Sequence, residues 1–206
     1  MNFIRKGGCV LSTLIIGLNL ASCSLINRTT EPNPAPQQHT VSKAVKKDKP
    51  PVTKKKPSKP IHWNQPSGGT YPKLQKNEAI QLDVSVKNQR VYVKDGDHTL
   101  YTMVISTGLD TKPQNSTPTG TYHIQGERGK WFYAPRYKEG AEYWVSWKNH
   151  GEFLFHSVPM DQNKKVIDAD AKRLGHKDSH GCIHLTVPDA KWIYENIPFN
   201  TKVVIH

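Results

Sequence analysis

The chain has 206 residues, enough for one ordinary domain with additional segments. It carries 29 Lys and Arg against 17 Asp and Glu, a formal net charge of +12 with neutral histidines. Residues 28–60 hold nine basic and two acidic side chains, whereas residues 61–206 hold 18 basic and 15 acidic ones. Because the excess belongs mostly to a short segment, a nucleic-acid-binding domain is not indicated.

The first 23 residues have the pattern of an export signal. Arg5 and Lys6 precede an apolar run at 10–20, which is too short to span a bilayer but long enough for a signal peptide. The sequence Leu-Ala-Ser-Cys that ends at Cys23 looks like a bacterial lipobox, which implies cleavage before Cys23 and lipid on its sulfur. Two acyl chains suffice for stable anchoring. We therefore expect a lipid-anchored protein on the extracytoplasmic side of a bacterial membrane; the alternative is an ordinary signal peptide with an incidental cysteine.

Residues 24–70 are rich in proline and lysine and have few large apolar side chains. Such a segment cannot bury enough surface to fold, so it is predicted to be a disordered tether. It would span about 40 Å as a random coil and about 150 Å when extended. Its positive charge suits anionic lipid head groups or wall polymers. A linker that only keeps the chain soluble is the alternative, and the folded domain is expected over 71–206.

From residue 79 onward the pattern predicts β-structure. Strict alternation over 79–86 predicts a strand with one buried face, and polar turns separate it from strands at 90–94 and 100–106 in an antiparallel meander. The remaining predicted elements are strands at 120–125, 153–157 and 201–205, a loop at 113–118 and a helix at 188–196. Aromatic side chains crowd residues 131–147, which is more typical of a core than of a binding groove. The sequence thus predicts a mainly β domain with one or two short helices, large enough for its own core.

The chemistry gathers around Cys182. Cys9 is removed with the signal peptide and Cys23 is lipidated, so Cys182 is the remaining thiol and has no partner for an internal disulfide. A thiol beside histidine is a plausible nucleophile once a base removes its proton. Gly181 allows a backbone or a substrate to approach closely. His156, at the end of the strand at 153–157, is a second candidate base.

Two other interpretations of the cysteine are open. A lone cysteine is often a small buried hydrophobe, although its neighbours here are poor core material. Alternation also places His180, Cys182 and His184 on one face of an extended segment, near His176, as in a zinc site. Structural zinc sites usually take paired ligands from two separate turns, and no second cluster exists. We therefore predict no metal and no organic cofactor.

The segment Ser179-His180-Gly181-Cys182 resembles the signature of the L,D-transpeptidase catalytic domain (YkuD type), a family of cysteine enzymes that remodel bacterial peptidoglycan. In the family a histidine ends a strand, a variable loop follows, and then comes Ser/Thr-His-Gly-Cys; here these parts are His156, 158–178 and 179–182. Ser-Thr-Gly at 106–108 and Thr-Pro-Thr-Gly-Thr-Tyr at 117–122 match two further family elements. The resemblance covers roughly 78–206 and implies a β-sandwich or barrel-like fold. One departure is His184, where many members have arginine.

The resemblance also implies roles for individual residues. Cys182 corresponds to the nucleophile and His156 to the base, whose imidazolium would stabilise the thiolate. The backbone carbonyl of Ser157 would orient the imidazole, and N–H groups near Gly181 and Cys182, helped by His180, would form the oxyanion hole. In the family the region around 131–147 partly walls the active site. Residues expected to contact substrate are His184, Ser179, Arg173, Tyr143 and Trp144, with Arg136 and Lys177 as further candidates for binding a carboxylate.

The implied substrate is a peptidoglycan stem tetrapeptide. The thiolate attacks the bond between the third, L-centred residue and the fourth, D-centred residue, and an amine of a neighbouring stem then forms a cross-link. With water as acceptor the same site is an L,D-carboxypeptidase. A sortase-like enzyme lacks Ser-His-Gly before its cysteine, and a non-catalytic wall-binding lipoprotein would have a broken site, whereas every expected position is filled here. We expect a monomer whose Cys182 is acylated by carbapenems, as in the family.

Overall fold

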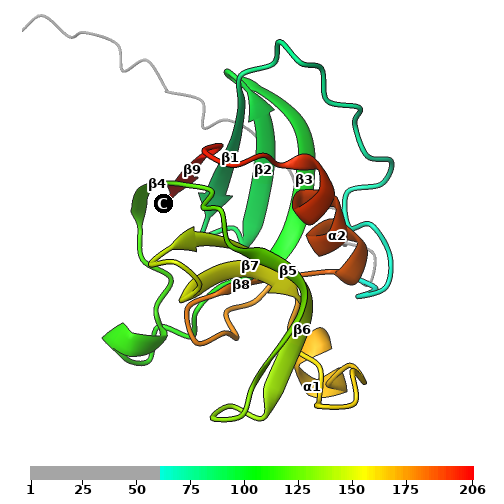
Figure 1. Ribbon diagram of the computed structural model, residues 1–206, viewed down its shortest axis with the longest axis vertical. Helices are drawn as coiled ribbons and strands as arrows, with labels where there is room; N and C mark the ends of the chain where they lie inside the picture. The colour runs from blue at the N-terminus through cyan, green and yellow to red at the C-terminus, as the bar shows by residue number, and fades with distance from the viewer. Residues whose placement is uncertain (1–60) are drawn as a thin grey trace, which may run out of the picture. The chain divides into compact units, whose positions relative to one another are not determined.

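The computed structural model describes residues 61–206 (Figure 1). The predicted signal peptide, the lipobox with Cys23 and most of the tether lie outside the described residues. Within 61–206 the strands are β1 (Ile80–Ser85), β2 (Arg90–Asp95), β3 (His98–Ser106), β4 (Gly120–His123), β5 (Arg128–Ala134), β6 (Glu139–Lys148), β7 (Phe153–Ser157), β8 (Ile183–Leu185) and β9 (Lys202–Ile205). The α-helices are α1 (Asp168–Ala171) and α2 (Val187–Asn196), and Pro113–Asn115 forms a 3₁₀ turn.

The strands make one sheet in the order β4-β9-β1-β2-β3-β8-β7-β6-β5. The predicted antiparallel meander of β1, β2 and β3 is present, and β9 runs parallel to β1 beside it. Figure 1 shows two groups of strands, with β1–β3 in the upper part of the domain and β5–β8 in the lower part. No helix within 61–206 is long and apolar enough to cross a membrane.

The two groups of strands meet where the predicted catalytic residues lie. The end of β3 pairs with β8 through Ile105–Leu185 and Ser106–His184. On its other edge β8 runs parallel to β7, and His156 pairs with His184 in that register. Neighbouring strands lie about 4.8 Å apart, so the two histidines are direct neighbours on the same face of the sheet.

Alternation in β1 and β2 explains the core of the domain. Leu82 and Val84 of β1 and Val91 and Val93 of β2 are fully buried, whereas Asp83 and Tyr92 between them are only partly buried. Each such side chain contributes about 1.5–3 kcal/mol on burial. Trp147, from the aromatic segment at 131–147, belongs to the same core, as predicted for aromatic crowding.

The domain begins earlier than residue 71, where the sequence analysis ends the tether. The hydroxyl of Ser67 donates to the Asp189 carboxylate at 2.5 Å, and Tyr71 donates to the same group at 2.8 Å. The backbone N–H of Val104 in turn donates to the Ser67 hydroxyl at 2.8 Å. Asp189 lies in the first turn of α2 and is fully buried, so it needs these donors. Composition alone missed this, because a buried carboxylate and the packing of Ile61 and Trp63 hold a segment that is otherwise typical of a linker.

Candidate active site

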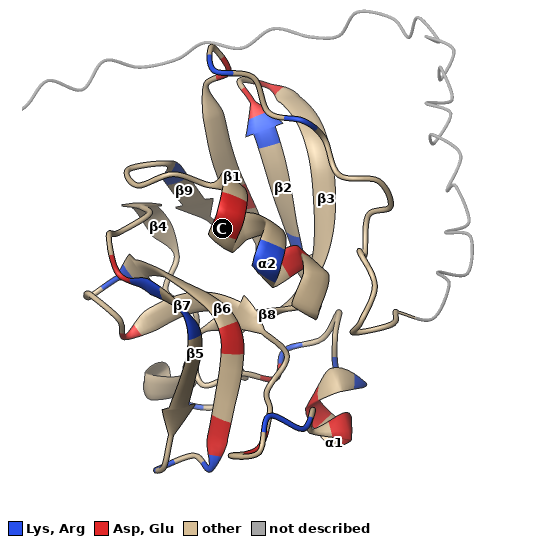
Figure 2. Ribbon diagram, turned by 45° about the vertical axis from the view of Figure 1, so that its right-hand side comes forward, with Lys and Arg blue, Asp and Glu red and all other residues tan. Residues whose placement is uncertain are grey.

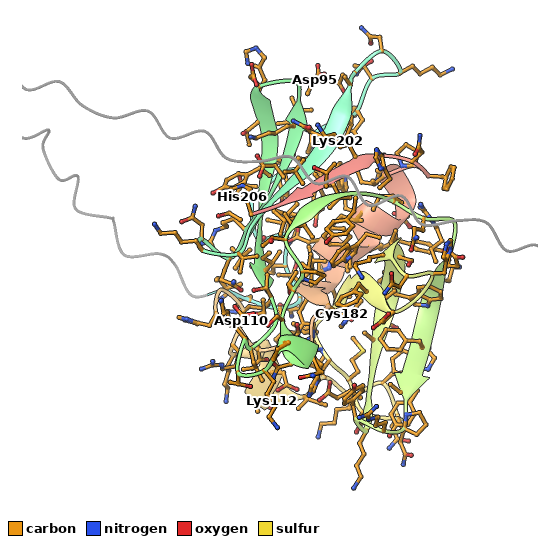
Figure 3. The ribbon with its side chains drawn as sticks, turned by 90° about the vertical axis from the view of Figure 1, so that its left-hand side faces the viewer. Asp95, Asp110, Lys112, Cys182, Lys202 and His206 are labelled. Carbon is orange, nitrogen blue, oxygen red and sulfur yellow. The ribbon has the colours of Figure 1, made fainter. Side chains whose placement is uncertain are left out.

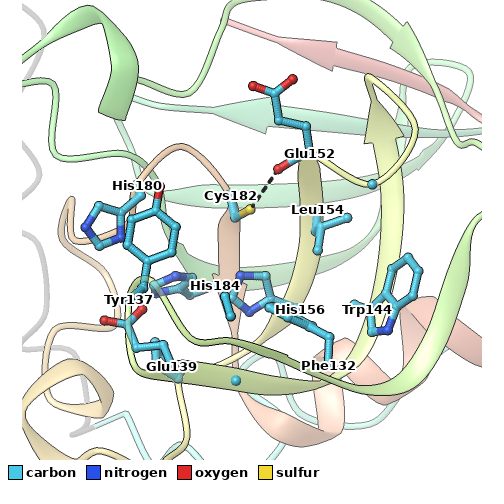
Figure 4. A pocket seen from close by; sticks show the side chains of 14 residues that line it. Phe132, Tyr137, Glu139, Trp144, Glu152, Leu154, His156, His180, Cys182 and His184 are labelled. Atoms are coloured by element: carbon cyan, nitrogen blue, oxygen red, sulfur yellow. Dashed lines mark hydrogen bonds between the residues drawn. The ribbon is translucent and has the colours of Figure 1, made fainter.

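A cavity of about 300 Å³ opens between the β5–β6 hairpin and the segment that carries Cys182 (Figure 4). Cys182 lies in the half of the domain opposite the β2–β3 turn at Asp95 (Figure 3). The cavity wall combines aromatic side chains with titratable ones. The titratable and aromatic residues of the wall are Phe132, Tyr137, Glu139, Trp144, Glu152, His156, His180, Cys182 and His184.

The segment before Cys182 is a tight turn held by its own side chains. The Ser179 hydroxyl accepts the N–H of Gly181 at 3.0 Å and donates to the Cys182 carbonyl at 2.6 Å. Gly181 has φ of +122°, a conformation that side chains rarely adopt, and a Cβ there would lie 3.0 Å from the Phe153 ring. The turn that positions the thiol therefore explains the Ser-His-Gly-Cys motif, because serine closes the turn by hydrogen bonds and glycine adopts its positive φ.

The Ser-Thr-Gly motif at 106–108 and the Thr-Pro-Thr-Gly-Thr-Tyr motif at 117–122 hold this turn through hydrogen bonds. The Thr107 carbonyl accepts the N–H groups of Asp178 and Ser179 at 2.8 and 3.0 Å. The Thr117 hydroxyl accepts the Gly108 N–H at 2.8 Å and donates to the Gly181 carbonyl at 2.9 Å. Residues far apart in the sequence thus form one hydrogen-bonded support for the cysteine turn.

His156 is buried and held in one orientation. Its Nδ1 lies 2.7 Å from the Ser157 carbonyl, so in the neutral ring Nδ1 carries the proton and Nε2 is free to accept one. The edge of the ring meets Phe132 at a centroid distance of 5.4 Å. Burial lowers the pKa of His156 to about 4, and the Ser157 carbonyl offsets only part of this shift.

The Cys182 thiol is partly exposed and donates to the Glu152 carbonyl at 3.6 Å. Burial raises the pKa of Cys182 to about 11; the Leu154 N–H opposes the shift, and the charges of Glu152 and Glu139 add to it. Burial thus disfavours both the thiolate and the imidazolium, and we expect thiol and imidazole to be neutral at pH 7 before substrate binds. The thiolate–imidazolium pair that the family resemblance implies stays a prediction, and it would have to form against this effect of burial.

The oxyanion-hole candidates are not equivalent. The Gly181 N–H is already bonded to the Ser179 hydroxyl. Within residues 61–206 the Cys182 N–H has no acceptor, so it is the free backbone donor beside the thiol. His180 is exposed and stacks on Tyr137 at a centroid distance of 4.4 Å, across the cavity mouth.

The five residues expected to contact substrate separate into two groups. His184 and Trp144 line the cavity. Ser179 is buried in the cysteine turn, Tyr143 packs on Tyr194, and Arg173 forms an ion pair with Asp178 at 3.4 Å. None of these last three lines the cavity, and the contacts of all five with substrate stay predictions.

Sequence reasoning did not find the two acids of the cavity wall. Glu139 begins β6 and Glu152 precedes β7, and neither lies in a motif. Burial, together with the charges of Asp170 and Asp178, raises the pKa of Glu139 to about 7. Within 61–206 no three His, Cys, Asp or Glu side chains are arranged to hold a metal ion.

Comparisons with known proteins identify the family of the domain. Residues 79–205 match the model of the L,D-transpeptidase catalytic domain, YkuD. The chain is 60% identical over 145 residues to a Bacillus subtilis (strain 168) protein named "Putative L,D-transpeptidase YciB", a match that covers 70% of this chain and 74% of that protein.

A solved L,D-transpeptidase structure has the same fold. An L,D-transpeptidase from Mycobacterium smegmatis matches with a TM-score of 0.50 and 18% identity over 63% of this chain and 59% of that one. A fused Zn-dependent amidase/peptidase/peptidoglycan-binding domain-containing protein from Clostridium acetobutylicum ATCC 824 matches with a TM-score of 0.47 and 31% identity, over 62% of this chain and 52% of that one. The chain thus spans a little over half of each structure. The mainly β fold with two helices is confirmed, and the chain belongs to the L,D-transpeptidase catalytic domain family.

Proposed function

We propose that this protein is a cysteine L,D-transpeptidase that cross-links peptidoglycan stem peptides. One observation carries the proposal: Cys182 and His156 line the same cavity, and His156 is held by the Ser157 carbonyl with Nε2 free to accept a proton. A nucleophile, a base and a group that orients the base are the parts that acyl transfer requires. Membership of the family supports the choice of stem peptides as substrate.

The first half-reaction forms a thioester. His156 Nε2 takes the thiol proton while the Cys182 sulfur attacks the carbonyl carbon of the third stem residue. Because both groups are neutral before substrate binds, this proton moves together with the attack rather than before it. The Cys182 N–H faces the developing oxyanion. The bond to the fourth residue then breaks, and its amine leaves with the proton from His156.

The second half-reaction resolves the thioester. A stem amine attacks the thioester carbonyl, the new amide forms and the Cys182 thiolate leaves and regains a proton. Water in place of the amine would give an L,D-carboxypeptidase. The aromatic wall of Phe132, Tyr137 and Trp144 limits the access of water to the thioester, which supports transfer to an amine.

The proposed location is the bacterial cell envelope. The segment at 20–23 resembles a lipobox, so lipid on Cys23 would anchor the protein to the membrane, and the Lys- and Pro-rich tether would let the domain reach the wall. We propose that the domain acts there as a monomer, without metal or cofactor.

The test is turnover of a defined tetrapeptide donor with an amine acceptor, followed by mass spectrometry. The wild-type protein should release the fourth residue and form the cross-linked dimer, and its intact mass should show a thioester. Cys182→Ala should do none of these, whereas the control His176→Ala, at an exposed histidine outside the cavity, should keep full turnover. Turnover by Cys182→Ala would remove the mechanism. Release of the fourth residue without a dimer would make the protein a carboxypeptidase, and binding without release would make it a wall-binding lipoprotein.

A further inference from the structure

The charged groups of the cavity wall are acids. Glu139 and Glu152 line it, and within the described residues no lysine or arginine does. Burial lowers the pKa of both His156 and His184, so these rings add no positive charge at pH 7. A cavity of this composition favours a cationic or neutral ligand over a carboxylate.

Glu139 is fixed in place without a counter-ion. It is the first residue of β6, and the next residue, Gly140, is bonded through its N–H and carbonyl to Met160 at 2.7 and 2.8 Å. Its side chain is half-buried, and among residues 61–206 it belongs to no ion pair. Figure 4 shows the carboxylate turned toward the cavity, on the same side as Tyr137 and His184.

The elements packed near Glu139 increase the negative charge there. Asp170 of α1 and Asp178 of the segment before the cysteine turn both act on its carboxyl group, and Figure 2 marks acidic positions on β6 and α1. Arg173 pairs with Asp178 and therefore does not neutralise Glu139. The other titratable groups that line the same cavity are Tyr137, Glu152, His156, His180, Cys182 and His184.

His184 gives a second, independent sign of a ligand. Its side chain is 5% exposed and lines the cavity, its ring packs against His156 at a centroid distance of 4.8 Å, and its Nδ1 has no hydrogen-bond partner in the described part of the chain. A buried polar atom without a hydrogen-bond partner destabilises the folded state. Such a cost is unusual in a native structure and indicates that a ligand with hydrogen-bonding groups belongs in the cavity.

We infer that Glu139 binds the acceptor amine as an ammonium ion and takes its proton before the amine attacks the Cys182 thioester. This inference rests on the proposed function and adds the group that selects the acceptor. An alkyl amine with a pKa near 10.4 is protonated at neutral pH and cannot attack until it loses a proton. A half-buried carboxylate without a counter-ion both attracts the ammonium and, with a pKa near the working pH, is suited to remove that proton.

The proton balance of the step is complete. The ammonium gives one proton to the Glu139 carboxylate, and the free amine attacks the thioester carbonyl carbon. As the carbon–sulfur bond breaks, the substituted nitrogen loses its second proton to His156, which returns it to the Cys182 thiolate. Glu139 then releases its proton to water. His156 alone cannot do both tasks, because its one free nitrogen accepts a single proton.

The experiment measures how the acyl-enzyme divides between an amine acceptor and water. The full-length protein is acylated with a tetrapeptide donor, and transfer to a stem peptide with a free side-chain amine is compared with hydrolysis. In Glu139→Gln the ratio of transfer to hydrolysis should fall at least tenfold; because both products come from the same acyl-enzyme, a change in the acylation rate does not enter this ratio. Glu139→Asp keeps the carboxylate and should retain most of the preference. Glu142→Gln is the matched control, because Glu142 lies on the same strand outside this cavity and should leave the ratio unchanged.

A second acceptor separates proton removal from general damage. Methoxyamine is unprotonated at pH 7, so Glu139→Gln should transfer to it as well as wild type does. In wild type the transfer to the stem amine should rise as pH passes through about 7 and then level off, whereas in Glu139→Gln it should start far lower and keep rising with the fraction of free amine. An unchanged ratio in Glu139→Gln, or an equal loss with methoxyamine, overturns the inference and leaves the proposed function intact. The absence of any acyl-enzyme in wild type overturns both.

Discussion

The neutral resting pair of Cys182 and His156 predicts unusual reactivity toward simple thiol reagents. A thiol with a pKa of about 11 is ionised in about one molecule in ten thousand at pH 7. An unperturbed cysteine, with a pKa of about 8.5, is ionised to a few per cent. Since the thiolate is the reactive form, iodoacetamide should alkylate Cys182 on the order of a hundredfold more slowly than a free cysteine peptide.

The assay follows alkylation of Cys182 by peptide mapping between pH 6 and 9. The rate should rise about tenfold per pH unit without a plateau, because the thiolate forms only as pH approaches the raised pKa. His156→Gln should change this rate less than about threefold, since the neutral ring does not stabilise a resting thiolate. His176→Gln, at an exposed histidine outside the cavity, is the control.

Two results would refute this reasoning. A plateau in the alkylation rate above about pH 5 would mean that a thiolate–imidazolium pair already exists in the unliganded site. A large loss of alkylation in His156→Gln would mean the same. In either case the two groups would interact more strongly than their separate burial indicates, and the proton would move before substrate binds.

Four further predictions concern other parts of the chain. His156→Ala should lower the rate of acylation by a carbapenem by roughly 10²–10⁴, whereas a larger effect from His180→Ala would show that the base is assigned wrongly. Gly108→Ala should cost about 1–3 kcal/mol in a denaturant melt, because the new Cβ would overlap the Asn115 carbonyl beneath the cysteine turn; an unchanged midpoint would contradict this. His184→Arg should lower the KM for free-acid stem peptides relative to amidated ones, and identical ratios in both proteins would show that residue 184 does not read the substrate. Cys23→Ala should move the protein out of the membrane fraction of cells, and full retention there would argue against the lipid anchor.

Local patterns predicted most of the first half of the domain. Alternation over 79–86 and the turns that follow it are short-range signals, and β1, β2 and β3 are present where they were expected. The hairpin of β5 and β6 was not predicted as strands. Its residues are partly buried on both faces of β5, so the aromatic segment shows no alternation from which a strand could be inferred.

The candidate site was likewise predictable only in the parts that local motifs reveal. Cys182, His156, His180 and His184 were identified from motifs, and all four line the cavity. The neutral charge state of the pair could not be predicted, because it depends on burial that the complete fold creates. Glu139 lies 43 positions before the cysteine in the printed sequence, and only the return of β6 toward β7 and β8 brings it to the cavity.

The histidine at position 184, where many members of the family have arginine, affects the charge state of Glu139, which has no counter-ion among residues 61–206. An arginine at 184 would bring a permanent charge into a cavity of about 300 Å³ that also contains Glu139. Two opposite charges in one partly buried cavity would attract each other, and Glu139 would lose both its raised pKa and its freedom to bind a cation. Histidine keeps the cavity free of positive charge, because burial holds the pKa of His184 well below its usual value. The residue that makes this chain atypical in its motif is thus the one that leaves Glu139 available for an ammonium ion.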